Sequence, residues 1–170
     1  MPRWCNLRLT VAASVAVCGP VVAQPGTAQA DAAMAGFGDA VRACIGAITP
    51  AGVDESKLVG WTGVDLSMDA KDQEPLRVLT RGRGPLIVAG TGKSAARSGC
   101  NVLSPTPAGL RFEDEVNGMS LVLGAPPTDR RRKGGEVMWV VGNIGTVLAP
   151  AGRVGQPAIR ATIVHIGELK

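Results

Sequence analysis

The residues with the most evident chemical potential lie in segment 89–94, which reads Ala-Gly-Thr-Gly-Lys-Ser. Gly-Lys-Ser ends the phosphate-binding loop of nucleoside triphosphatases, where backbone amides wrap the phosphates. That motif also requires a glycine five residues before Gly92, and this chain has Ile87 there. We therefore interpret the segment between Gly90 and Gly99 as a loop joining two strands rather than a nucleotide site.

The same loop has a second interpretation. It carries Lys93, Ser94 and Arg97, and glycines at both ends allow an exposed tip. Protein inhibitors present such loops to enzyme clefts and gain affinity when the loop is preorganised. A protein inhibitor that uses the Gly90–Gly99 loop is therefore an alternative function.

His165 is the only imidazole in the chain, so it alone offers histidine base or ligand chemistry. The sequence has no Gly-x-Ser-x-Gly nucleophile elbow and no C-x-x-C pair for zinc. We predict no catalytic residue, no metal site and no cofactor. A cofactor-free hydrolase that uses His165 is kept as a further alternative.

The densest charge run is Arg130, Arg131 and Arg132, followed by Lys133. Such a run is usually a solvated loop, but it also fits an anionic surface or an acidic partner protein. The acidic residues 113–115 are an alternative partner within the same molecule.

Trp61 and Trp139 are the tryptophans outside the leader described next. We interpret them as anchors of the core or of a sheet surface. If the chain is a binding module, a concave apolar patch is expected near one of them.

Residues 1–30 have the three parts of a secretory signal peptide. Arg3 and Arg8 form the positive start, an apolar stretch runs over 9–23, and Ala28-Gln29-Ala30 is a small-x-small cleavage site. The mature protein is expected to begin near Asp31, in the periplasm or outside the cell.

Two alternatives concern the same leader. Cleavage after Ala23 is a weaker option. Lipidation at Cys18 would anchor the product to a membrane, although Val17 is not the small residue expected before a lipidated cysteine. We predict no membrane-spanning segment in the mature chain.

The charge balance argues against one class of partner. The full chain carries 18 Lys and Arg against 14 Asp and Glu, for a net charge of +4. Loss of Arg3 and Arg8 with the leader leaves 16 basic residues and a net charge of +2. Nucleic-acid binding requires larger, clustered positive charge, so no nucleic-acid partner is expected.

Two of the four cysteines, Cys44 and Cys100, remain after removal of the leader. In an oxidising compartment a pair of cysteines most simply forms one disulfide. We predict this bond, and expect it to connect a helix to a strand.

Two helices are expected. Apolar residues at helical spacing over 37–48 end at Thr49-Pro50, and a second apolar stripe covers 112–123 before Gly124. Thr106-Pro107 is predicted to cap the second helix. The carboxylates of 113–115 are expected on its solvent side, near the positive end of the helix dipole.

The strands are predicted over 76–81, 86–89, 100–103, 136–148 and 158–166, with a turn region over 149–157. Gly142 and Gly145 are interpreted as a bulge or bend within one strand. Short connections favour antiparallel neighbours.

These elements predict an α+β fold for a single domain over 31–170. Two helices would pack on one side of a largely antiparallel sheet of four to five strands, joined by one disulfide. The expected function is that of an exported, non-enzymatic domain that binds a protein or small ligand in the cell envelope. Besides the arginine run and the loop, Trp61 and Trp139 are its candidate binding residues.

Overall fold

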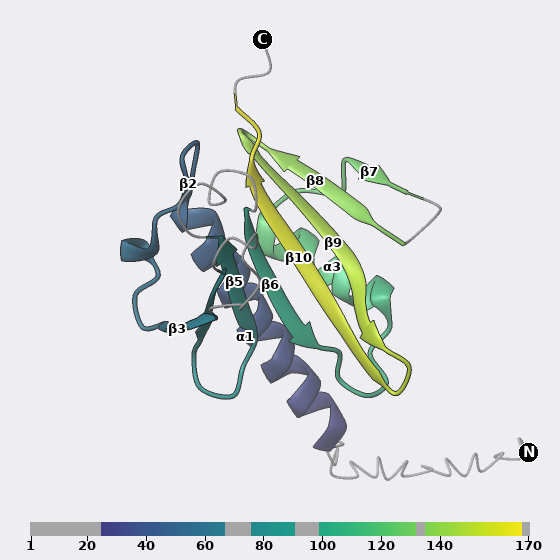
Figure 1. Ribbon diagram of the computed structural model, residues 1–170. Helices are drawn as coiled ribbons and strands as arrows, with labels where there is room; N and C mark the ends of the chain where they lie inside the picture. Colours follow the sequence, from purple (N-terminus) through teal and green to yellow (C-terminus); the bar gives the residue numbers. More distant parts are fainter. Residues whose placement is uncertain (1–24, 67–75, 91–98, 132–134, 168–170) are drawn as a thin grey trace, which may run out of the picture.

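A computed structural model describes residues 25–66, 76–90, 99–131 and 135–167 (Figure 1). Its helices are α1 (Pro25–Ala47), the 3₁₀ helix η1 (Glu55–Lys57) and α3 (Phe112–Leu123). Its strands are β1 (Ile48–Thr49), β2 (Gly52–Val53), β3 (Thr62–Leu66), β4 (Leu76–Thr80), β5 (Leu86–Gly90), β6 (Cys100–Pro105), β7 (Asp129–Arg130), β8 (Val137–Val141), β9 (Ile144–Arg153) and β10 (Gln156–His165).

The main sheet has eight strands in the order β3-β4-β5-β6-β10-β9-β8-β7, and every neighbouring pair is antiparallel. Strands β1 and β2 form a separate small hairpin. The sheet consists of two meanders, β3 to β6 and β7 to β10, and each meander follows one α-helix in the chain. The described chain therefore repeats the order of one helix followed by four sheet strands.

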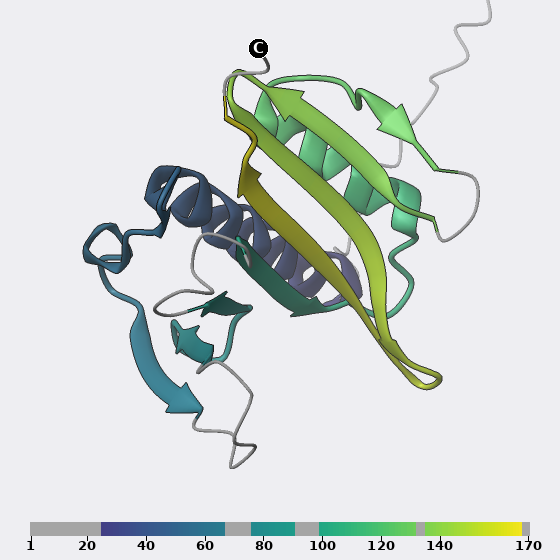
Figure 2. The same ribbon diagram turned by 45° about the horizontal axis from the view of Figure 1, so that its top comes forward.

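The two meanders are joined where the last strand of the first, β6, pairs with the last strand of the second, β10. Strand β6 lies against β10 over six residue pairs, from Cys100↔Ile163 to Pro105↔Ala158. The two meanders touch within the sheet only through this pair. Strands β9 and β10 form a long hairpin that runs beyond the rest of the sheet (Figure 2).

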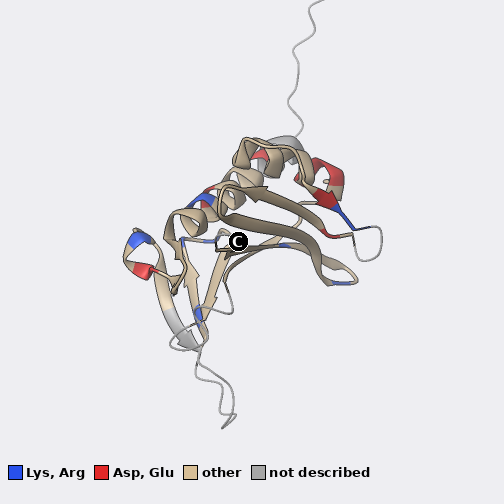
Figure 3. Ribbon diagram, turned by 90° about the horizontal axis from the view of Figure 1, so that it is seen from above, with Lys and Arg blue, Asp and Glu red and all other residues tan. Residues whose placement is uncertain are grey.

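Both α-helices lie on the same face of the sheet (Figure 3). The core fills the space between them and the strands. It includes Phe37 and Val41 of α1 and Met119 of α3, together with Trp139 and Ile163 from the sheet. All are at most 2 % exposed.

Helix α1 buries the predicted apolar stripe, and Cys44 is fully buried on it. This placement brings Cys44 next to the first residue of β6, where it forms a disulfide with Cys100 across a Cα–Cα distance of 5.7 Å. The predicted pairing is confirmed. The bond fixes the C-terminal part of α1 against a central strand of the sheet.

Helix α3 ends, as expected, just before Gly124, which adopts a left-handed conformation with φ of 65°. Its start differs from the prediction. Thr106 and Pro107 lie in the segment before the helix, and Arg111 is the N-cap residue, with the Asp114 carboxylate accepting from its backbone N–H. Glu115 also differs, because it is buried rather than on the solvent side.

The predicted α+β fold with a sheet of four to five strands is wrong, since the main sheet has eight. Segment 136–148 is a hairpin of β8 and β9, in which Gly142, with φ of 59°, forms a tight turn rather than a bulge. Segment 149–157 also contains more strand than turn, because β9 extends to Arg153 and β10 begins at Gln156. The sequence does not predict strands β1, β2, β3 and β7.

The disulfide closes a sequence separation of 56 residues, which the chain-entropy model values at about 4 kcal/mol. We expect the double variant Cys44→Ala/Cys100→Ala to unfold at a lower urea concentration than the oxidised protein, by up to that free energy. Adding a reductant should destabilise the wild type and leave the double variant unchanged. Equal unfolding midpoints for the two proteins under oxidising conditions would contradict this expectation.

Candidate functional site: a groove between α1 and the end of β6

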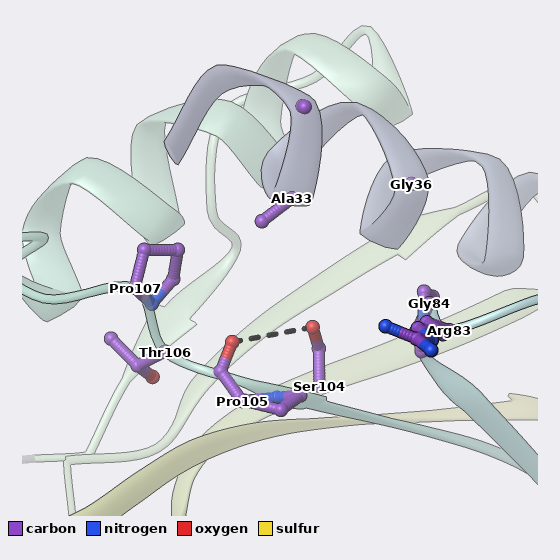
Figure 4. Close-up of a pocket in the computed structure, with 10 residues that line it drawn as sticks. Ala33, Gly36, Arg83, Gly84, Ser104, Pro105, Thr106 and Pro107 are labelled. Carbon is purple, nitrogen blue, oxygen red and sulfur yellow. Dashed lines mark hydrogen bonds between the residues drawn. The ribbon is translucent and has the colours of Figure 1, made fainter. Parts of the chain in front are cut away.

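Among the described residues, helix α1 and the end of β6 border a groove of about 520 Å³. Helix α1 forms one wall, and the turn before β5 and the segment that ends β6 form the others (Figure 4). Ala33 points from the helix towards Ser104 and Pro105, while Pro107 and Arg83 lie at opposite ends. The lining residues are Ala32, Ala33, Gly36, Arg83, Gly84, Pro85, Ser104, Pro105, Thr106 and Pro107.

The composition of the lining restricts its hydrogen bonding. Pro85, Pro105 and Pro107 have no backbone N–H and therefore offer only carbonyl acceptors. The hydroxyl of Ser104 donates to the carbonyl oxygen of Pro105 at 3.4 Å. Arg83 is the only charged lining residue. The groove thus presents rigid apolar walls with mostly acceptor oxygens and one cation at its end.

Thr106 connects the groove to a buried carboxyl group. Its hydroxyl donates to Oε1 of Glu115 at 2.9 Å, which leaves the lone pairs of the threonine oxygen as acceptors. Glu115 is 1 % exposed and lines a second hollow of about 190 Å³ between the start of α3 and the β9–β10 hairpin. Thr106 lines both hollows.

Burial raises the pKa of the Glu115 carboxyl above its ordinary value, and the nearby negative charge of Asp114 acts in the same direction. The hydrogen bond from Thr106 opposes this effect. The net direction favours the protonated acid, which is the form that tolerates an apolar environment.

Trp61 lies next to the groove. It is half-buried and lines a hollow of about 200 Å³ together with Gly36, Gly84 and Pro85, all of which also line the main groove. Trp139 is different, since it is fully buried and its indole N–H donates to Oγ of Ser120 at 3.3 Å. The structure therefore places one tryptophan beside the groove and the other in the core.

The predicted basic run is in part paired within the molecule. Arg130 forms an ion pair of 2.9 Å with Glu113, and Arg131 forms one of 3.5 Å with Glu136. Figure 3 shows the acidic start of α3 beside the basic segment at β7. The intramolecular alternative is confirmed for Arg130. Arg132 lies outside the described residues.

The candidate loop residues also lie outside the described part of the chain, namely Lys93, Ser94 and Arg97. The structure therefore does not test the inhibitor-loop hypothesis. The described residues that flank the loop are Gly90, at the end of β5, and Gly99. The disulfide at Cys100 fixes the chain directly after it.

His165 contacts an amide and a backbone group. The N–H of Gly167 donates to Nδ1 at 3.1 Å, and the side-chain amide of Asn143 lies 2.6 Å from Nε2. The Asn143 atom nearest to Nε2 is Nδ2, and the donor and acceptor roles in this contact depend on the tautomer of the ring. Neither neighbour is a nucleophile or a carboxylate, and this arrangement is typical of a histidine that holds a chain end in place.

Sequence reasoning missed the groove and Glu115. The groove is formed by prolines and small side chains, which carry no chemical signature in a sequence. Glu115 was assigned to the solvent side with its neighbours, although its position one residue before the apolar Val116 and four before Met119 places it on the edge of the buried stripe. That spacing was a usable signal.

The raised pKa of Glu115 predicts a pH dependence of stability. Well below the unfolded-state pKa of about 4.5, Glu115 is protonated in both the folded and the unfolded state, so its burial as a charged group does not lower the free energy of unfolding. As pH rises towards the folded pKa, the unfolded chain loses its proton first, so the protein loses stability. Glu115→Gln, which keeps an oxygen for Thr106, should be more stable relative to wild type at pH 7 than at pH 4, as measured by urea unfolding.

Glu113→Gln serves as the control, because this carboxylate is exposed on the same helix and pairs with Arg130. It should show no gain at pH 7. A stability difference between Glu115→Gln and wild type that is the same at both pH values would exclude the buried-acid interpretation.

Comparison with known proteins gives no further guide to this site. The chain matches no model of a known protein family, no curated protein and no solved structure.

Proposed function

We propose that this protein is an exported, non-enzymatic binding domain and that its ligand occupies the groove between α1 and the end of β6. The observation that carries this proposal is the groove itself, whose volume of about 520 Å³ is in the range of small-molecule sites. Three prolines with fixed φ angles make its walls rigid, and a rigid site loses little entropy when it binds.

The lining indicates what the ligand presents. Apolar contact with the alanine, glycine and proline walls supplies most of the buried area. Hydroxyl and carbonyl oxygens of Ser104, Pro105 and Thr106 match N–H or O–H donors. An acceptor or anionic group at the other end would face Arg83. A small, mostly apolar molecule with a donor group fits this pattern best.

Export is the second part of the proposal. It rests on the signal-like leader over 1–30 and is compatible with the Cys44–Cys100 bond, since such bonds persist in oxidising compartments. Among the described residues, neither α-helix combines the length and the apolar character needed to cross a bilayer. Periplasmic or extracellular placement follows from the leader.

The groove hypothesis predicts that filling it abolishes binding. Ala33→Leu would project into the groove, whereas Ala35→Leu changes an exposed position of the same helix outside the lining. We expect a small-molecule screen by thermal shift to find ligands that stabilise wild type and Ala35→Leu. The same ligands should leave the melting temperature of Ala33→Leu unchanged.

A ligand that stabilises Ala33→Leu as much as wild type binds elsewhere and would count against the groove. Melting of Ala33→Leu without ligand serves as the folding control. A full screen with no stabilising compound would count against a small-molecule ligand.

The export hypothesis predicts the mass of the protein from its native cells. A soluble envelope species that begins at Asp31 should gain two hydrogens on reduction, because one disulfide opens. A species that begins after Ala23 would move the cleavage site, and a lipidated species would begin at Cys18. An uncleaved cytoplasmic chain with free thiols would contradict export.

A further inference from the structure

The second face of the sheet, which the α-helices do not cover, is largely apolar. Residues that pair across antiparallel strands point to the same face, and neighbours along one strand alternate. Arg160 and Thr162 of β10 therefore point away from the core, opposite to Ile159, Ala161 and Ile163. We call this surface the open face.

The register gives the composition of the open face. One row across the strands joins Met138, Val147, Thr162, Asn101, Val88 and Val78. The adjacent row joins Ala149, Arg160, Leu103, Leu86 and Thr80. Leu86 is 40 % exposed. Asp129 of β7 pairs with Met138 and extends the first row, so Arg160 is the only basic side chain among the paired residues of the two rows.

Arg160 lies in a hollow of about 250 Å³ on the open face. Its lining residues are Arg131, Glu136, Met138, Val147, Arg160 and Thr162. Glu136 is the only carboxylate of this set, and it pairs with Arg131 at 3.5 Å. No ion pair among the described residues includes Arg160. The hollow therefore keeps one uncompensated positive charge.

The neighbours of Arg160 on the open face carry no negative charge. Its cross-strand neighbours are Ala149 and Leu103, and its same-face neighbours along β10 are Ala158 and Thr162. None of these four is acidic. Arg160 is exposed, so its guanidinium is accessible to an anionic group from solvent.

We propose that the open face binds one molecule of a long-chain carboxylate, with its head at Arg160 and its aliphatic tail along the apolar rows. The single uncompensated guanidinium matches a monoanionic head, which it can bind through two parallel hydrogen bonds. From Arg160 the tail reaches Leu103 and then Leu86 over two strand spacings, about 10 Å. This site is separate from the groove beside α1.

The test is a calorimetric titration of the disulfide-bonded protein with dodecanoate below its micelle concentration. We expect one bound molecule per chain. Propionate, which has the same head without the tail, and dodecyltrimethylammonium, which has the opposite charge, should bind much more weakly. Arg160→Gln should weaken dodecanoate binding about tenfold or more, and Arg160→Lys should lie between it and wild type.

Arg153→Gln is the matched control. Arg153 lies at the tip of the same hairpin, pairs with Gln156 and does not line the hollow, so its loss should leave the affinity unchanged. Failure of dodecanoate to bind, equal binding of the cationic amphiphile, or an unchanged affinity in Arg160→Gln would each overturn the proposal. Loss of binding in Ala33→Leu but not in Arg160→Gln would do the same and assign the amphiphile to the groove.

Discussion

The pairing of β6 with β10 is the constraint on which the rest of the molecule depends. It is the only place where the two meanders share strand contacts in the sheet. Both strands also supply core residues below α1, and Cys100 at the start of β6 is bonded to that helix. A break at this pair would divide the sheet into its two meanders.

The same pair determines where both candidate sites lie. Strand β6 extends past its pairing with β5 at Ser104 and Pro105, which pair only with β10, and these two residues line the groove against α1. On the opposite face, Arg160 of β10 lies beside Leu103 of β6. One pair of central strands therefore borders the groove on the helix side and the hollow that contains Arg160 on the other side, and the two hollows have different linings.

The sequence predicted local structure better than it predicted the sheet. The helical stripe around Phe37 and Cys44 was recognisable because spacing alone fixes which side is buried. The hairpin at Gly142 was not, since a glycine within a run of valines is consistent with a bulge or a turn, and only the pairing of β8 with β9 distinguishes them. The prolines and glycines between 149 and 157 likewise favoured a turn, although most of this segment belongs to β9 and β10.

The candidate sites were less predictable because they arise from long-range contacts. Cys44 and Cys100 could be paired by elimination. No local pattern brings Thr106 to Glu115, or surrounds Arg160 with apolar neighbours from two other strands. Trp61 lies beside the groove, but most residues that line the groove are alanine, glycine or proline, which give no sequence signal of a binding site.

The starting point of α1 links maturation to the shape of the groove. The helix begins at Pro25, six residues before the proposed mature start at Asp31. Cleavage after Ala30 would place a new chain terminus one residue before Ala32, the first lining residue. Its ammonium group would oppose the helix dipole there, while the Asp31 carboxylate would favour it. Cleavage after Ala23 would instead retain the whole helix. The position of cleavage would therefore determine how many helical residues precede the groove-lining part of α1, and so how stable that wall of the groove is.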